Sequence, residues 1–427
     1  MSKKISVIGL GYVGLPLSAE FSKKFTVVGY DIDFTRINEL RRGVDRTNEL
    51  CGENLNQLRK INLTTEKNDI SDSNIYIITV PTPVDENNQP DLSLLKSASE
   101  LVGAYLSNGD IVIYESTVFP GCTEEICVPL LEKFSKKIYN QDFSVGYSPE
   151  RINPGDKNHT LQNITKIVSG SNESALKTIN ELYSSIINAP IYEVSSIKVA
   201  EAAKVIENTQ RDVNIALINE LAFVFDRLNI KTSEVLEAAA TKWNFLSFKP
   251  GLVGGHCIGV DPYYLTYKAL EVGYHPEMIL AGRKINDQMG EFIVSKTIAE
   301  MLKQNINPIK SNVAVLGITF KENCPDIRNT KVLTIINGLI DHKCNVTISD
   351  YIASKNEVKE KLDFNLLKLN SIEKQDAIVV AVGHQQYINL KKEDWEKMLK
   401  PGGVLIDVKS ILSDNILDLL NFRYWSL

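Results

Sequence analysis

The sequence predicts an α/β fold in which two Rossmann-like, doubly wound domains are joined by a long central helix. Short β-branched runs alternate with helix-like segments in the first half of the chain, and the same alternation returns in the last third. Alternation of this kind favours a parallel sheet with crossover helices. The region between them contains no Pro or Gly over 196–228, which favours a helix. We therefore expect three domains, at 1–190, 191–300 and 301–427.

Eight apolar runs have the length and the β-branched content of buried strands. In the first half they lie at 4–9, 26–31, 74–80 and 110–114, and in the last third at 312–317, 345–350, 376–382 and 403–408. The second run of each set ends in an aspartate, Asp31 and Asp350. The two sets indicate domains of similar plan, without a detectable sequence repeat.

The central region predicts one helix from about Ser196 to Leu228. Its apolar residues recur at three- and four-residue spacings, as on the buried face of a helix. At ~1.5 Å per residue such a helix is about 50 Å long, which is more than one domain needs. It would link the two α/β domains or support a homodimer. The alternative is two shorter helices with an unmarked break.

Composition narrows the class of protein. The 427 residues are 43% hydrophobic and 23% charged, with a net charge of −6, so nothing indicates a nucleic-acid or membrane partner. The six cysteines form no CxxC pair and no zinc-type cluster, so we expect no metal site and the reduced thiols of a cytoplasmic protein. The apolar run from Ile5 to Leu17 faintly resembles a signal peptide. Its three glycines fit a nucleotide-binding turn better.

The run Gly9-Leu10-Gly11-Tyr12-Val13-Gly14 is a GxGxxG motif directly after the first predicted strand. Gly9 permits a tight turn, Gly11 lets the backbone approach a pyrophosphate, and Gly14 lets helix and strand pack closely. The N-terminus of the following helix supplies free N–H groups to phosphates. A lone GxGxxG is a weak signal, but this one has the strand, the helix and an acidic residue in the expected places.

That acidic residue is Asp31, at the end of the second predicted strand. A carboxylate there accepts a hydrogen bond from the ribose 2′-hydroxyl of NAD and repels the 2′-phosphate of NADP. We therefore expect NAD as cofactor. Arg36 follows closely, and an arginine at such a position can accommodate a 2′-phosphate, which leaves NADP as the alternative.

Two further features carry chemistry only in combination. Residues 250–262 surround Cys257 with four glycines, which makes an accessible thiol, although a structural cysteine is about equally compatible with the composition. Lys204 and Asn208 share one face of the predicted long helix, at i and i+4. A lysine on a long helix is most often simply solvated.

Six blocks in order resemble the UDP-glucose/GDP-mannose dehydrogenase family over nearly the whole chain. Besides the glycine turn they are Ser116-Thr117-Val118, Tyr147-Ser148-Pro149-Glu150-Arg151, Glu201-Ala202-Ala203-Lys204 with Asn208, Gly254-Gly255-His256-Cys257 with Asp261, and Phe320-Lys321 with Asp326 and Arg328. Lys242-Trp243-Asn244-Phe245 and the run after Gly254 are most similar to UDP-N-acetylhexosamine 6-dehydrogenases. Family members that act on UDP-glucose typically carry serine at the position of His256, so glucose is disfavoured.

The resemblance implies a four-electron oxidation of the C6 alcohol of a UDP-sugar, for capsule or O-antigen synthesis, with the second α/β domain holding the UDP. Cys257 would trap the aldehyde as a thiohemiacetal that becomes a thioester, while Lys204 and Asn208 stabilise the oxyanion. Asp261 with a water, and Thr117 nearby, would move protons, and Glu150 would be the base for thioester hydrolysis. UDP-GlcNAc is the expected sugar and UDP-GalNAc the next, with UDP-ManNAc and UDP-glucose as alternatives.

The resemblance also assigns binding residues. Lys242 would reach the site of a neighbouring subunit in a homodimer. The expected cofactor-binding residues are Gly9, Gly11, Tyr12, Val13, Gly14, Asp31, Arg36, Thr82, Thr117 and Arg328. The expected substrate-binding residues are Glu150, Arg151, Lys204, Asn208, Lys249, Gly251, Gly254, Gly255, Phe320 and Lys321.

Two rival interpretations predict different outcomes. A two-electron dehydrogenase of the β-hydroxyacid type also pairs a Rossmann domain with a lysine and an asparagine one helical turn apart, but it has no thiol loop and no second nucleotide-type domain. It would form one NADH per substrate, whereas the thiol route forms two. An NAD-binding redox sensor or scaffold would form none, and it has no need for Cys257, Lys204 and Glu150 together.

Overall fold

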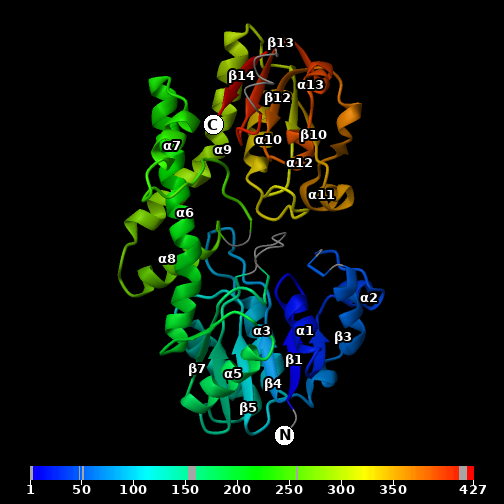
Figure 1. Ribbon diagram of the computed structural model, residues 1–427, viewed down its shortest axis with the longest axis vertical. Helices are drawn as coiled ribbons and strands as arrows, with labels where there is room; N and C mark the ends of the chain where they lie inside the picture. Colours follow the sequence, from blue (N-terminus) through cyan, green and yellow to red (C-terminus); the bar gives the residue numbers. More distant parts are fainter. Residues whose placement is uncertain (1–2, 48, 51, 152–159, 256–257, 413–420) are drawn as a thin grey trace. The chain divides into compact units, whose positions relative to one another are not determined.

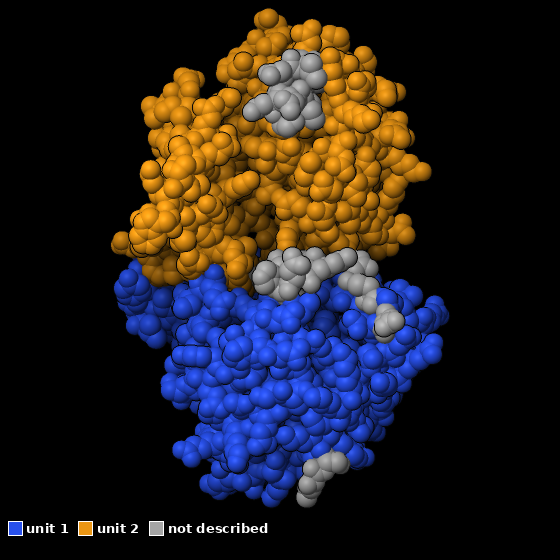
Figure 2. Space-filling view, in the orientation of Figure 1, with its two compact units in different colours: residues 1–207, 263–275 blue, residues 208–262, 276–427 orange. Residues whose placement is uncertain are grey.

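The structure is a computed structural model that describes residues 3–47, 49–50, 52–151, 160–255, 258–412 and 421–427. The chain forms two compact units, coloured separately in Figure 2. Unit 1 comprises residues 1–207 and 263–275, and unit 2 comprises 208–262 and 276–427. The chain passes between the units three times: within α6 (Ile197–Leu228), within the first turn of α8 (Asp261–Glu271), and just before α9 (Glu277–Lys303).

Unit 1 is built on an eight-stranded sheet in the order β3-β2-β1-β4-β5-β6-β7-β8 (Figure 1). The first six strands have the strand order typical of a dinucleotide-binding fold. All neighbouring pairs are parallel except β6 and β7, which are antiparallel. The strands are β1 (Lys4–Ile8), β2 (Thr26–Tyr30), β3 (Ile61–Thr64), β4 (Ile75–Ile78), β5 (Asp110–Tyr114), β6 (Phe143–Tyr147), β7 (Lys166–Gly170) and β8 (Ile191–Glu193).

The central strands of this sheet are apolar and covered on both faces. Every residue of β4 and β5 is buried, as a parallel sheet between helical layers requires. The covering elements are α1 (Gly14–Phe21), α2 (Phe34–Arg41), η1 (Gly52–Lys60), η2 (Lys67–Ile70), α3 (Ser93–Gly103), η3 (Thr123–Cys127), α4 (Val128–Ser135) and α5 (Glu173–Ser184).

The predicted central helix is confirmed as one continuous element, α6, of 32 residues. The alternative of two shorter helices is therefore wrong, because no residue in the segment interrupts the backbone ladder. Among the described residues, no helix combines the length and the apolar character needed to cross a lipid bilayer.

Unit 2 contains a six-stranded, fully parallel sheet in the order β11-β10-β9-β12-β13-β14 (Figure 1). Its strands are β9 (Asn312–Leu316), β10 (Asn345–Ser349), β11 (Leu366–Leu367), β12 (Gln375–Val380), β13 (Leu399–Asp407) and β14 (Arg423–Ser426). Its other elements are α7 (Thr232–Ala240), α9 (Glu277–Lys303), α10 (Val332–Asp341), α11 (Lys355–Leu362), η4 (Leu369–Ser371), α12 (Gln385–Ile388) and α13 (Lys392–Met398). The predicted class, two Rossmann-like domains with a long central helix, is confirmed.

The two sheets share a detail after their first strands. In unit 1 the Leu10 N–H donates to Asp31 Oδ2 at 2.8 Å, and in unit 2 the Ile318 N–H donates to Asp350 Oδ2 at 2.7 Å. Each loop begins with a glycine in the left-handed region, with φ of 96° before Leu10 and 88° before Ile318. The two aspartates that end matching runs in the sequence therefore perform the same structural task in both domains.

Candidate active site

In unit 1 the predicted site residues gather at one edge of the sheet. The carboxyl ends of parallel strands meet at the same edge, which is where open α/β sheets bind ligands. The glycine turn follows β1, Asp31 follows β2, Thr82 follows β4, Thr117 follows β5, and Glu150 and Arg151 follow β6. Because the strand order reverses between β1 and β4, the glycine turn lies at the switch point of the sheet.

The three glycines of the turn do the different tasks that the motif predicts. Gly9 has a φ of 96°, which favours glycine. A Cβ on Gly14 would lie 1.9 Å from the carbonyl oxygen of Gly9, so only glycine fits there. A Cβ on Gly11 would meet no atom within 4 Å, so this stretch of backbone is open to a ligand. The turn therefore fits the pyrophosphate of a dinucleotide.

Three side chains brace the turn. Asp31 accepts from Leu10 N–H and, through Oδ1, from Asp33 N–H at 2.9 Å. Arg36 is buried, donates through Nε to the Leu10 carbonyl at 3.0 Å, and lies 2.9 Å from Asp45 Oδ1. Thr79 Oγ1 donates to the Gly9 carbonyl at 2.7 Å. Arg36 is thus engaged in structural contacts, and Thr79, which the motif does not include, was missed from the sequence.

The loops that carry Thr82 and Thr117 are tied together. Thr82 Oγ1 donates to the Thr117 carbonyl at 2.7 Å, and Ser116 Oγ donates to the Val80 carbonyl at 2.7 Å. Tyr264, from the part of α8 in unit 1, donates to the Pro83 carbonyl at 3.1 Å. The two loops therefore form one connected rim beside the glycine turn.

Lys204 is held by the segment that follows β6. Its ammonium Nζ donates to the Glu150 carbonyl at 2.6 Å, and its own carbonyl accepts from Arg151 Nη2 at 2.7 Å. Arg151 also pairs with Glu207, one turn further along α6. The Lys204 side chain is 7% exposed, so it is not the solvated lysine that a long helix usually carries.

The Glu150 carboxylate belongs to a buried network that the sequence did not reveal. Lys166 Nζ lies 2.6 Å from Glu150 Oε2 and 2.9 Å from Glu115 Oε2. Glu115 also accepts from the Tyr183 hydroxyl, and Glu150 Oε1 accepts from the Arg151 N–H at 2.5 Å. All four network residues, Lys166, Glu115, Glu150 and Tyr183, are buried.

The network fixes the protonation of its members. Burial raises the pKa of Glu115 despite the nearby ammonium, whereas the Lys166 ammonium and the Arg151 N–H hold the pKa of Glu150 below its usual range against the effect of burial. Burial opposes the charge on Lys166, but the two carboxylates raise its pKa. Lys166 is therefore a cation and Glu150 an anion at neutral pH.

In unit 2, Asn208 and Asp261 are paired. Asn208 Nδ2 donates to Asp261 Oδ2 at 2.6 Å, and both side chains are buried. Asp261 is the first residue of α8, where the helix dipole favours a negative charge. Asn208 lies one turn after Lys204 on α6, as the spacing predicts. The helix thus presents a cationic donor and an amide donor in succession.

The glycine-rich segment before Cys257 contacts two other parts of unit 2, the helix α6 and the loop that follows β9. Asn219 of α6 accepts from the Gly251 N–H at 2.8 Å and donates to the Gly251 carbonyl at 3.1 Å. Gly255 has a φ of 83°, and a Cβ on it would lie 2.6 Å from the Phe320 ring. A Cβ on Gly254 would lie 2.7 Å from the Asn329 carbonyl. These glycines permit a close approach to the loop that follows β9.

The remaining predicted residues of unit 2 lie near this segment in the chain or after β9. Lys249 is exposed, and Phe320 and Lys321 are half-buried after β9. Arg328 pairs with Asp326, with Nη2 at 2.5 Å from Oδ2. Cys257 and His256 lie outside the described residues.

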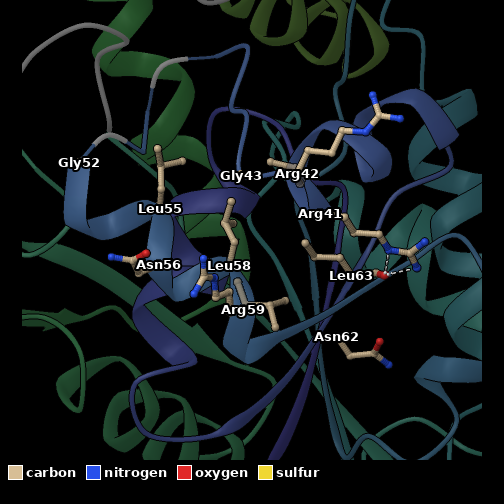
Figure 3. Close-up of a pocket in the computed structure, with 12 residues that line it drawn as sticks. Arg41, Arg42, Gly43, Gly52, Leu55, Asn56, Leu58, Arg59, Asn62 and Leu63 are labelled. Atoms are coloured by element: carbon tan, nitrogen blue, oxygen red, sulfur yellow. Dashed lines mark hydrogen bonds between the residues drawn. The ribbon is translucent and has the colours of Figure 1, made fainter.

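A separate cavity of about 560 Å³ lies in unit 1 and contains none of the predicted site residues (Figure 3). It is bounded by the end of α2, by η1 and by the edge strand β3. Arg41 turns to the strand, where Nη2 donates to the Leu63 carbonyl at 2.6 Å (Figure 3). This arginine covers a hydrogen-bonding group on the exposed edge of the sheet.

These contacts define what the residues of each unit can do chemically. The glycine turn and Asp31 suit a dinucleotide. The Lys204 ammonium and the Asn208 amide are preorganised donors of the kind that stabilise an oxygen anion. Asp261 is a carboxylate beside one of these donors and can exchange protons.

Comparison with known protein families finds three domains of one family along the chain. The NAD binding domain of the UDP-glucose/GDP-mannose dehydrogenase family matches residues 3–187, its central domain matches 198–288, and its UDP binding domain matches 314–414. Together the three matches cover most of the chain, including the segments that carry the glycine turn, Lys204 and Phe320.

Several proteins are similar over their full length. The chain is 53% identical over 427 residues to protein CapL of Staphylococcus aureus, covering 100% of both chains. It is 54% identical over 411 residues to the UDP-N-acetyl-D-glucosamine 6-dehydrogenase of Salmonella typhi, covering 96% of each. The solved UDP-D-ManNAc dehydrogenase of Pyrococcus horikoshii is 31% identical, covers 99% of this chain and 98% of its own, and superposes with a TM-score of 0.88.

Proposed function

The chain belongs to the UDP-glucose/GDP-mannose dehydrogenase family, and from this premise we propose that it oxidises the C6 alcohol of a UDP-N-acetylhexosamine to the carboxylate with NAD. UDP-GlcNAc is the proposed substrate and UDP-GalNAc the next candidate. The 54% identity to a UDP-N-acetyl-D-glucosamine 6-dehydrogenase supports UDP-GlcNAc as the first candidate. The product would enter a capsule or O-antigen polysaccharide.

UDP-ManNAc is a further alternative. The 31% identity and the shared fold of the Pyrococcus horikoshii enzyme support it, but less strongly than the relative at 54% supports UDP-GlcNAc. The epimers differ in the orientation of one substituent, and no described residue distinguishes them. UDP-glucose remains a more distant alternative.

The observation that carries the proposal is the pair of donors on α6. Lys204 is a buried ammonium fixed by the Glu150 carbonyl, and Asn208 follows one turn later, bonded to Asp261. A buried cation and an amide at this spacing stabilise the oxyanion that forms at C6 while it is oxidised. In water such donors would be worth far less, because solvent screens them.

The cofactor-binding residues fit NAD. Bound NAD supplies the hydride acceptor at each of the two oxidation stages. The open backbone at Gly11 admits the pyrophosphate, and Asp31 keeps lone pairs for the ribose hydroxyl beyond those taken by Leu10 N–H and Asp33 N–H. Arg36 is buried against Asp45 and so is not available to a 2′-phosphate, which supports NAD over NADP.

Cys257 is the proposed nucleophile. After the first hydride leaves C6, its thiolate adds to the aldehyde carbon and forms a thiohemiacetal. Loss of the second hydride turns this adduct into a thioester, and attack by water breaks the C–S bond to release the carboxylate and the thiol. The glycines before Cys257 support this role because they bring the backbone close to Phe320 and leave no side chain in the way.

Proton transfer is assigned to Asp261 with a water, and Thr117 assists. Glu150 is expected from the family resemblance to be the base for hydrolysis. Its two carboxylate oxygens accept from Lys166 and from the Arg151 N–H, and its pKa is held below the usual range, so it is a weak proton acceptor.

We also propose a homodimer in the cytoplasm. On α6 the large apolar residues Leu217, Val224 and Leu228 are exposed at spacings that place them on one side of the helix, and Trp243 after α7 is 97% exposed. Apolar surface of this kind is usually covered by a partner. The four described free thiols, Cys122, Cys127, Cys324 and Cys344, fit a reducing compartment.

A substrate panel tests the proposal. NADH absorbance is followed with UDP-GlcNAc, UDP-GalNAc, UDP-ManNAc and UDP-glucose, and kcat/KM is compared. The proposal predicts the highest value for UDP-GlcNAc and no acid from any sugar in a Cys257→Ala variant. NADH from none of the sugars would overturn it in favour of a binding protein, and uronic acid at the normal rate from the variant would remove the thioester route.

A further inference from the structure

The buried network around Lys166 has a geometric link to the proposed oxyanion donor. Lys166, on the first residue of β7, binds Glu115 after β5 and Glu150 after β6. Lys166 therefore connects the carboxyl ends of β5 and β6 with the beginning of β7, at the edge of the sheet where the predicted site residues of unit 1 lie. Glu150 connects this network to Lys204, because the Glu150 carbonyl accepts from Lys204 Nζ at 2.6 Å.

We propose that Lys166 and Glu115 form a brace that positions the Lys204 ammonium, and that Glu150 is the anchor of this brace. The inference rests on the proposed role of Lys204 as oxyanion donor. The brace fixes the Glu150 carboxylate, the fixed residue orients its own carbonyl, and the carbonyl directs Lys204 Nζ. Lys166 is a positioning residue in this account, since it acts through Glu150.

Charge supports the same conclusion. With both carboxylates ionised the brace carries two negative charges and one positive charge, and Lys204 lies close enough to lower the pKa of Glu150. If Glu115 is protonated, the charges of Lys166 and Glu150 cancel, so the brace has no net positive charge that would repel the Lys204 ammonium. The charges of the brace therefore do not oppose a positively charged donor at Lys204.

A purely structural role for this ion pair is the competing explanation. Buried pairs are often no better than apolar replacements for stability, so a lysine with two carboxylates at the edge of a sheet needs another reason. The brace explains why the charged group contacts Glu150 in particular, and why the Glu150 carbonyl points to Lys204. The two explanations differ in one measurable outcome. A positioning role predicts that loss of Lys166 slows hydride transfer by more than a loss of stability explains, whereas a structural role predicts a change in stability alone.

The test replaces Lys166 in the full-length enzyme and measures the rate of the first hydride transfer in single turnovers with NAD and UDP-GlcNAc. Lys166→Met should slow this step roughly 10- to 100-fold, as expected for a misplaced donor, with little change in the affinity for NAD. Lys166→Arg keeps the charge and can donate to both carboxylates, so it should recover most of the rate. A Lys166→Met enzyme with the wild-type rate would overturn the proposal.

Two controls separate positioning from stability. Asp110 is a buried carboxylate at the opposite end of β5 from Glu115, and it accepts from the Ser107 N–H at 2.6 Å. Asp110→Asn should lower the melting temperature without slowing hydride transfer. If Lys166→Met does not fold, Tyr183→Phe removes only the hydroxyl that donates to Glu115, and it should slow the same step by a smaller factor. An unchanged rate in a folded Tyr183→Phe enzyme would count against the brace.

Glu150→Gln distinguishes an anchor from a hydrolytic base. Gln keeps the backbone carbonyl and one acceptor for Lys166, so an anchor predicts a moderately slower first step and no accumulated intermediate. A base predicts a normal first step and a sugar adduct on Cys257 that intact-protein mass measurement detects, and this result would overturn the anchor role. Failure of the proposed function is separate, because the wild-type enzyme would then form no NADH with any UDP-sugar.

Discussion

Replacing Gly11 by alanine tests whether the glycine turn holds a dinucleotide. A Cβ at this position meets no protein atom within 4 Å, and Gly11 is not among the glycines with positive φ, so the variant should fold normally. The methyl group would occupy the space that the pyrophosphate needs. Hydrogen bonds to a charged group are worth about 1.5–3 kcal/mol, so NAD affinity should fall roughly 10- to 150-fold.

Gly14→Ala is the contrasting variant. Its Cβ would lie 1.9 Å from the Gly9 carbonyl oxygen and 2.4 Å from Thr79 Oγ1, so the backbone must shift. Overpacking of this kind costs about 1–3 kcal/mol, which corresponds to a loss of several degrees in melting temperature. Calorimetric titration with NAD and thermal melting measure both variants. An unchanged NAD affinity in a folded Gly11→Ala protein would refute the assignment of the pyrophosphate to this turn.

Three further predictions concern Asp31, Glu201 and Arg283. Asp31→Ala should weaken NAD binding and reduce the preference over NADP in calorimetric titrations; unchanged NAD affinity would remove it from the ribose site. Burial raises the pKa of Glu201 from 4.5 to about 7, so in this pH range the folded state binds a proton that the unfolded state has lost. The free energy of unfolding should therefore fall by up to roughly 3 kcal/mol as the pH rises from 4.5 to about 7. Denaturant titrations should show that Glu201→Gln lacks this slope; an equal slope would assign the effect elsewhere. Arg283→Met removes the cation that lies 2.6 Å from the buried Asp212 carboxylate and leaves the Asn286 amide as a neutral donor to it, which should cost about 3–5 kcal/mol of stability. A second change, Asp212→Leu, should largely restore the stability; no loss in the single variant would contradict this.

The sequence predicted the elements whose signal is contiguous. The glycine turn after β1, the paired aspartates Asp31 and Asp350, and α6 each depend on residues close together in the chain, where local spacing determines the structure. The strands β3, β6, β7, β8, β11 and β14 were not predicted. The pairing of β7 shows why: it runs antiparallel to β6 and parallel to β8, a choice that depends on long-range packing.

The buried network could not be predicted for a similar reason. Lys166 and Glu115 lie far apart in the chain, and neither belongs to a motif, so an isolated lysine favours a solvated surface position. Only the order of β5, β6 and β7 brings them together. Asn219 was missed likewise, since nothing in the helical pattern indicates that it binds the backbone of Gly251.

The most direct test of the account is the amount of NADH formed for each molecule of UDP-GlcNAc consumed when the sugar is limiting. Trapping of the aldehyde on Cys257 predicts two NADH for each sugar and a product with a carboxylate at C6. A ratio of one, with a free aldehyde or ketone as product, would contradict the thiol-linked mechanism and favour a two-electron dehydrogenase.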